Sequence, residues 1–239
     1  MRRHTARMFV IAAVAAITLA AATARPTRAQ DRPDAPTVAA WVQAFYDQTQ
    51  SMSAAFVQRY VNRVYQREDT SRGRVRFRKP GMMRFDYADP NGKVIVSDGA
   101  RLVAYDPPDE GESRGQYVDQ QISDAQLPAA LSFLTGTGRL DEDFRFRSLD
   151  ASALNYDGEI LELRGRRPNP HYARILLFVD AGRGGAAGRS RRGMVHRILI
   201  FDSSNNRNRF DFTDQQVNRP IPESVFRWRP PGNARRIQP

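Results

Sequence analysis

The alternation of hydrophobic and polar positions is clearest in residues 73–106, where it predicts an antiparallel meander. Apolar side chains alternate with arginine over 74–78, and the alternation resumes over 83–87. A period of two is typical of a strand with one buried face. Asn91-Gly92 and Asp98-Gly99 are dipeptides that favour tight hairpin turns. The segment therefore predicts consecutive hairpin strands with one apolar face and one face rich in arginine.

Two further segments have the spacing of amphipathic helices. Apolar residues recur at helical spacing over 38–50, and Thr37 before them is a residue type that caps helices. A second apolar stripe over 125–135 ends at Gly136. The Arg- and Gly-rich segment 181–193 predicts a long hairpin loop without regular structure. Other strands are predicted at residues 52–67, 116–121, 144–149, 159–164, 172–180, 194–202, 207–217 and 225–229.

The predicted sheet is larger than the predicted helices can cover. About eleven strands of about seven residues present a face on the order of 1,100 Å². Two helices of about 12 residues cover only about 360 Å². The fold class is therefore mainly β, and the sheet either folds on itself as a sandwich or barrel or encloses an apolar cavity. Alternation does not distinguish a sheet folded on itself from a sheet around a cavity, because a packed core and a pocket wall use the same residues.

Lys79 has the strand parity of Val75 and Phe77, so it is predicted to project from the apolar face just before Pro80. A lysine among apolar residues is costly unless its ammonium group finds partners. One interpretation is a strand-end lysine that extends to solvent. The other is a polar group at the mouth of a cavity, hydrogen-bonded to carbonyls of the segment that closes it.

The first 30 residues have the organisation of a secretory signal peptide. Arg2, Arg3 and Arg7 precede an apolar run of 15 residues over 8–22. Small residues suitable for cleavage follow near residue 24 and again near 29–30. The run is shorter than the roughly 20 residues that a membrane-spanning helix needs. We therefore expect residues 1–30 to direct export to the periplasm, and residues 31–239 to form one domain.

Composition narrows the possible functions. The chain has no cysteine, which excludes disulfides, thiol catalysis and a lipid anchor on this chain. Its formal charge of +11 falls to +6 for residues 31–239, and export makes nucleic acid an improbable partner. His171 and His196 are the histidines beyond the predicted signal, and both fall at turns or strand starts. No catalytic or metal-ligand motif is present, so no enzymatic activity or cofactor is predicted.

Several motifs in the sequence resemble those of a known protein family. The runs G-x-V-x-F-x-K-P-G-x-M-R-F-x-Y-x-x-P (73–90) and I-V-S-D-G-x-x-L-x-x-Y-D (95–106) resemble the periplasmic outer-membrane lipoprotein carrier (LolA) family. The Pro/Leu segment at 127–134 and F-x-W-x-P-P-G-N (226–233) fit as well. The resemblance implies an incomplete β-barrel: one strongly curved antiparallel sheet, lidded by short helices over an apolar cavity for the acyl chains of lipoproteins.

The resemblance also implies roles for individual residues and partners. Lys79 takes the place of a basic residue, usually arginine, that latches the lid. The partners implied are acylated lipoproteins as cargo, an inner-membrane ABC transporter as donor and an outer-membrane acceptor, with the carrier a monomer. The predicted lid residues are Leu127, Leu131 and Leu134. The predicted cavity residues are Val75, Phe77, Met83, Phe85, Tyr87, Val96, Phe144 and Phe146.

One alternative function stays open at the level of sequence. A periplasmic lipid-binding or lipid-sensing module could use the same half-barrel, because fold alone does not fix the ligand. The predicted cavity residues would then contact a different lipid. In either case Phe85→Glu is expected to retain the fold and lose the ligand, since a carboxylate is costly among acyl chains.

Overall fold

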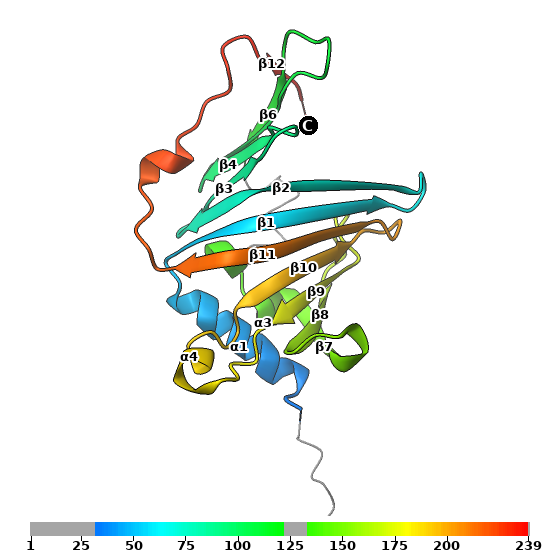
Figure 1. Cartoon of the computed structure of the whole chain (residues 1–239), viewed down its shortest axis with the longest axis vertical. Helices are drawn as coiled ribbons and strands as arrows, with labels where there is room; N and C mark the ends of the chain where they lie inside the picture. Colours follow the sequence, from blue (N-terminus) through cyan, green and yellow to red (C-terminus); the bar gives the residue numbers. More distant parts are fainter. Residues whose placement is uncertain (1–31, 122–132, 239) are drawn as a thin grey trace, which may run out of the picture. The chain divides into compact units, whose positions relative to one another are not determined.

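The computed structural model describes residues 32–121 and 133–238. The chain divides into two compact units, Met1–Arg32 and Pro33–Pro239, and every helix and strand described lies in the second. A single sheet dominates this unit, with strands in the order β12-β6-β5-β4-β3-β2-β1-β11-β10-β9-β8-β7 (Figure 1). All neighbours pair antiparallel except β12 and β6. The prediction of a mainly β fold built on one open antiparallel sheet with short helices is confirmed.

The element bounds are as follows. The described helices are α1 (Ala35–Gln48), α3 (Leu140–Asp143) and α4 (Gly185–Arg189), with 3₁₀ turns η2 (Ser152–Leu154) and η3 (Glu223–Phe226). The strands are β1 (Ser51–Asn62), β2 (Arg67–Arg78), β3 (Met82–Tyr87), β4 (Val94–Asp98), β5 (Arg101–Asp106), β6 (Gln116–Gln121), β7 (Phe144–Leu149), β8 (Glu159–Gly165), β9 (Arg174–Val179), β10 (Val195–Phe201), β11 (Arg207–Val217) and β12 (Arg235–Arg236).

Helix α1 begins earlier than the sequence pattern predicts. Its N-cap is Asp34, whose side chain accepts the Thr37 N–H at 2.9 Å, so the prediction of Thr37 as the cap is wrong. A carboxylate at this position satisfies an amide that has no partner within the helix. The buried stripe of the helix is Val38, Ala39, Val42 and Tyr46.

Three other predicted elements differ from the structure. The strand at 52–67 is interrupted, because the Asn62 side chain accepts the amides of residues 64 and 65 and closes a turn before β2. The strand at 225–229 does not form: η3 ends at Phe226, residues 227–229 are irregular, and the Trp228 ring lies tilted near that of Tyr105 with centroids 5.5 Å apart. The loop at 181–193 contains the short helix α4.

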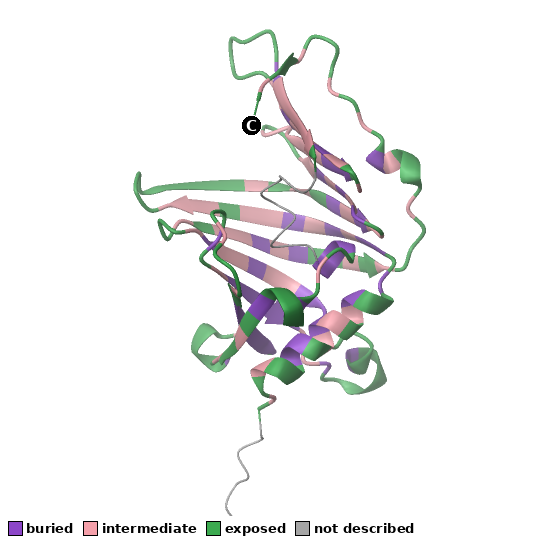
Figure 2. Cartoon of the chain, turned by 180° about the vertical axis from the view of Figure 1, so that it is seen from behind, coloured by how far each residue is buried: buried purple, intermediate pink, exposed green. Residues whose placement is uncertain are grey.

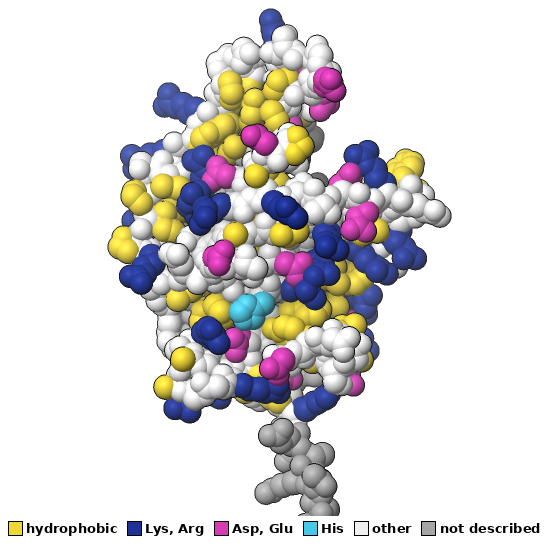
Figure 3. Space-filling model, viewed as in Figure 1, with side chains coloured by type: hydrophobic (Ala, Val, Ile, Leu, Met, Phe, Trp, Pro, Cys, Tyr) yellow, Lys and Arg dark blue, Asp and Glu magenta, His cyan; other side chains and the backbone are white. Residues whose placement is uncertain are grey.

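The sheet has two faces of different character. The inner face carries the main hydrophobic cluster, which includes Phe56, Phe85 and Ile198 together with the buried stripe of α1. Figure 2 shows α1 across this face, and α1 contacts α3, β7 and β8. The outer face carries arginines and a smaller cluster that includes Ile160 and Phe178. Figure 3 shows basic and hydrophobic side chains interspersed on the side seen in Figure 1.

Candidate functional site

Four predicted cavity residues lie together on the inner face. Antiparallel register places Val75 opposite Phe85 and Phe77 opposite Met83, so all four side chains share one side of β2 and β3. Each is at most 2% exposed. The Phe85 ring lies 5.6 Å from that of Phe56 and 5.8 Å from that of Phe77, centroid to centroid, in edge-to-face geometry. This part of the inner face is therefore closely packed.

Three more predicted residues lie at other places on the same face. Phe144 is buried and packs near Tyr172, with ring centroids 6.0 Å apart. Phe146 and Tyr87 are partly exposed and pack against the main cluster. Burial, with a smaller effect from the Asp106 carboxylate, raises the pKa of Tyr87, so its hydroxyl stays neutral.

Val96 was predicted to line the cavity, but it lies on the outer face. It pairs with Arg84 and Val103, whereas Ile95 pairs with Phe85 and therefore shares the inner face. Val96 is only 2% exposed, yet it does not belong to the inner-face cluster. Side chains of a strand alternate between faces, so a register error of one residue exchanges the two.

Some partly exposed residues of the inner face were not predicted from the sequence. These are Ile95, Ala104 and Ile200, which pack at the edge of the main cluster. The alternation of residues 198–200 could have predicted that Ile200 lies on the inner face, because Ile198, two residues earlier on the same face, is fully buried. Together with Tyr87 and Phe146, residues 95, 104 and 200 form partly exposed apolar surface on the inner face among the residues that the structure describes.

Helix α1 is fastened to the sheet through Tyr46. The Tyr46 hydroxyl accepts the Val195 N–H at 3.2 Å, and burial raises the pKa of this hydroxyl so that it stays protonated. Its ring lies 5.3 Å from that of Phe133, centroid to centroid. The predicted lid residue Leu134 is 3% exposed beside Phe133. Leu127 and Leu131 fall outside the described residues.

Lys79, the residue predicted as the latch of the lid, hydrogen-bonds the end of helix α1. Its ammonium nitrogen donates to the carbonyl oxygens of Tyr46 at 2.5 Å and Asp47 at 3.3 Å, in the last turn of α1. Carbonyls at a helix C-terminus lack partners within the helix and attract cations. The stem of Lys79 passes so close to Gly136 that a Cβ there would lie 2.7 Å from its Cε. One lysine thus joins β2, α1 and the segment that follows Leu134.

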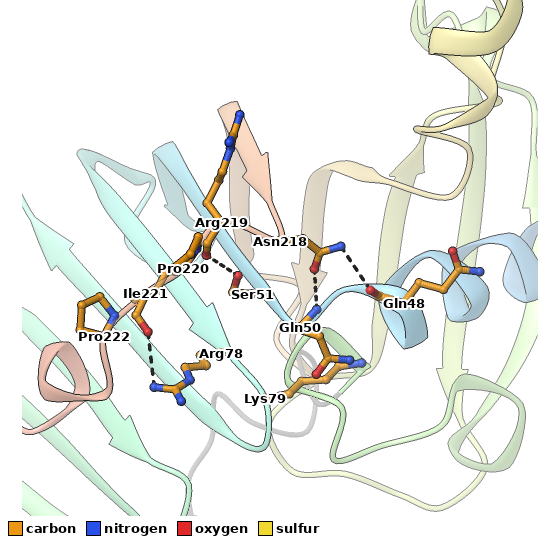
Figure 4. A pocket seen from close by; sticks show the side chains of 10 residues that line it. All are labelled: Gln48, Gln50, Ser51, Arg78, Lys79, Asn218, Arg219, Pro220, Ile221 and Pro222. Carbon is orange, nitrogen blue, oxygen red and sulfur yellow. Dashed lines mark hydrogen bonds between the residues drawn. The ribbon is translucent and has the colours of Figure 1, made fainter.

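A pocket of about 740 Å³ lies beside this junction (Figure 4). Arg78, Lys79 and Arg219 line it, and none of its lining residues is acidic. Asn218 closes one side by accepting the Gln50 N–H at 2.8 Å. The other lining residues are Gln48, Ser51, Pro220, Ile221 and Pro222. Because the pocket borders Lys79, the ammonium group has open space next to its contacts with α1.

The loop between β9 and β10 also contacts α1. The Arg192 guanidinium lies 4.9 Å from the Trp41 ring centroid, a distance at which a cation attracts the ring face. Gly193 approaches the backbone of Trp41 so closely that a Cβ would lie 2.1 Å from its carbonyl oxygen. The Arg- and Gly-rich segment therefore packs against the helix that covers the inner face.

Within residues 32–121 and 133–238, no group of three His, Cys, Asp or Glu side chains is placed to hold a metal ion. In the same ranges no helix has the length and hydropathy needed to cross a bilayer. The inner face with its α1 cover is the candidate site.

Comparison with known proteins identifies the family. The profile of the family described as "Outer membrane lipoprotein carrier protein LolA" matches residues 47–182, more than half of the chain. The chain belongs to the LolA family. The family predicted from the 73–106 motifs is thereby confirmed, and the match includes β2, β3 and Lys79.

Individual relatives are distant but cover most of the chain. The outer-membrane lipoprotein carrier protein of Bordetella avium is 28% identical over 225 residues, which is 94% of each chain. That of Nitrosospira multiformis is 24% identical over 193 residues, covering 81% of this chain and 84% of the relative. A solved LolA superfamily protein from Nitrosomonas europaea is 18% identical with a TM-score of 0.45, covering 82% of this chain and 98% of its own.

Proposed function

We propose that this LolA family member is a periplasmic chaperone that binds the acyl chains of lipoproteins released from the inner membrane and carries them to the outer membrane. Its donor is an inner-membrane ABC transporter, and its acceptor is a lipoprotein or the membrane on the far side. It acts as a monomer, without a cofactor and without catalysis. Residues 1–30 serve as the export signal and are removed.

The observation that carries the proposal is the apolar inner face held under α1 by Lys79. The face continues beyond the helix as the partly exposed Ile95, Ala104 and Ile200. The latch consists of hydrogen bonds to two carbonyls, which can break without unfolding the sheet. An apolar face with a releasable cover suits a ligand that must be bound and later handed on.

The physical need for such a carrier is large. Three acyl chains carry roughly 40 methylene groups, and exposing each to water costs about 0.8 kcal/mol. Unassisted transfer would therefore cost on the order of 30 kcal/mol. A protein surface that replaces the apolar environment of the membrane removes most of this cost and requires no chemical reaction.

Native mass spectrometry of the protein, isolated from the periplasm without detergent, tests the proposal. An adduct containing a polypeptide with an acylated N-terminal cysteine is the expected result. A phospholipid adduct instead would favour the lipid-binding alternative and contradict the lipoprotein cargo. The mass of the protein itself locates the signal cleavage, expected near residue 24 or near 29–30.

The matched pair Ile200→Glu and Leu199→Glu locates the binding surface. Both residues are partly buried neighbours in β10, but Ile200 packs on the inner-face cluster and Leu199 on the outer-face cluster. Loss of the cargo adduct is expected only for Ile200→Glu. Equal loss in both variants would contradict the inner face as the site. Phe85→Glu, which the sequence led us to expect would retain the fold, is the weaker test, because Phe85 is 1% exposed in a ring cluster and a charge there destabilises the fold.

A further inference from the structure

The turn between β1 and β2 exposes two large hydrophobic side chains side by side. Val64 is 69% exposed and Tyr65 is 79% exposed. Most large apolar side chains of the described chain are buried or partly buried, and Leu154 at 51% is the other that is largely exposed. Figure 1 shows this turn at the free end of the longest hairpin of the sheet. We call residues 63–66 the hairpin tip.

The hairpin tip is built by specific hydrogen bonds. The Asn62 side-chain oxygen accepts the Val64 N–H at 3.0 Å and the Tyr65 N–H at 3.1 Å. The Arg63 N–H donates to the side chain of Asn206 at 2.8 Å, which ties the tip to the β10–β11 turn. Two apolar side chains are therefore presented on a supported turn.

Arginines surround the tip. Residues 59–72 hold four arginines against Glu68 and Asp69, and Asp69 pairs with Arg67 at 2.9 Å. Arg63, in the tip itself, is exposed and forms no ion pair with any residue that the structure describes. Figure 3 shows hydrophobic surface beside basic surface at this end of the molecule. The tip thus combines an aromatic ring, an aliphatic group and available positive charge.

We propose that the hairpin tip docks this protein on a lipid bilayer that contains anionic phospholipid. A tyrosine ring is favourable at the level of the headgroups, where its apolar body and polar hydroxyl both find partners. Arginines next to it are attracted to anionic headgroups. A stable protein interface buries about 800 Å² on each partner, and two side chains on a convex turn supply much less. The tip therefore fits a membrane better than a protein partner.

The position of the tip keeps membrane contact away from the latch. β1 begins at Ser51, next to Gln50, whose carbonyl accepts the Lys79 N–H, and it ends at Asn62 beside the tip. Twelve strand residues span roughly 35–40 Å. Docking through the tip leaves α1 and the Lys79 junction free. The proposal does not require a cargo, so it stands or falls independently of the proposed carrier function.

Vesicle flotation with cargo-free processed protein tests the docking. We expect flotation with vesicles of phosphatidylglycerol and phosphatidylethanolamine, little with phosphatidylcholine alone, and a decrease as salt is raised. Tyr65→Asp is expected to lower the partition coefficient at least about fivefold, since it removes the apolar anchor and adds repulsion. The matched control Leu154→Asp places the same charge at the other exposed apolar residue and should bind as wild type.

A fluorescent probe gives a second readout that does not depend on binding strength. The chain has no cysteine, so Tyr65→Cys and Leu154→Cys each create one labelling site for an environment-sensitive dye. Vesicles should shift the emission to shorter wavelength only for the label at residue 65. An unchanged Tyr65→Asp partition, or an equal shift at both labels, would overturn the proposal. Absence of wild-type binding to any vesicle would also overturn it, and would leave a protein as the occupant of the tip.

Discussion

Replacing Lys79 with methionine removes the latch while retaining most of its shape. The unbranched methionine side chain keeps the packing against Gly136 but cannot donate to the carbonyls of Tyr46 and Asp47. The Tyr46 carbonyl keeps the Thr49 N–H as a partner at 3.0 Å, so no buried carbonyl loses every hydrogen bond. A hydrogen bond to a charged group contributes about 1.5–3 kcal/mol, and the lower end applies because Lys79 is partly exposed. About 1.5 kcal/mol corresponds to about a tenfold shift toward the state with α1 released.

Hydrogen exchange of the α1 amides measures this shift. Amides in the second half of α1 should exchange about tenfold faster in Lys79→Met, and Lys79→Arg should restore most of the protection because a guanidinium reaches the same carbonyls. Lys93→Met is the matched control, because Lys93 is the one other lysine and pairs with Asp106 at 2.7 Å. Unchanged exchange in Lys79→Met, or the same increase in Lys93→Met, would refute the latch.

Two further changes test other parts of the fold. Burial alone would raise the pKa of Glu162, but hydrogen bonds from Arg164 and Arg147 outweigh it and lower the pKa, so this carboxylate stabilises the fold above its ordinary pKa and loses that effect as pH falls through the lowered value. Glu162→Gln should cost about 1–2 kcal/mol in urea unfolding at pH 7 and progressively less toward pH 3. Gly136→Ala, at φ +73° against Lys79, should lower the melting temperature more than Gly111→Ala, at φ +88° with nothing within 4 Å.

The sequence predicted the elements better than their boundaries. β11 was predicted at residues 207–217 and occupies those residues, because Phe210 and Phe212 alternate with charged residues at its centre. Its pairing with β1 shifts register between Thr213 and Gln216, where the alternation is lost. The break between β1 and β2 was missed, since it depends on one Asn62 side chain that holds two amides. The prediction of a strand around Phe226 was wrong for a related reason. Alternation of Phe226 and Trp228 describes side-chain spacing, but none of the strands in the described part of the chain pairs with that segment.

The candidate site was predicted in part for the same physical reasons. Val75, Phe77 and Phe85 were placed together because their parity follows from continuous alternation within β2 and β3. Val96 was misplaced, since the register of β4 depends on the turn before it and not on its own apolar residues. The contact of Lys79 with α1 joins residues more than 30 positions apart. Parity indicated the face of that lysine, while only the folded chain identifies Tyr46 and Asp47 as its acceptors.

The packing of the inner face determines how much binding free energy the proposed cargo must supply. The predicted cavity residues near Phe85 are almost fully buried, so acyl chains can reach them only if groups packed in the inner-face cluster, such as α1, move. Moving α1 exposes Val38, Val42 and Tyr46, at about 2 kcal/mol each, and breaks the Lys79 contacts at about 1.5 kcal/mol. The total of about 7.5 kcal/mol is offset by burying about nine methylene groups at about 0.8 kcal/mol each. One long acyl chain therefore offsets a large part of the cost of displacing the helix, which also loses the hydrogen bond between Tyr46 and Val195.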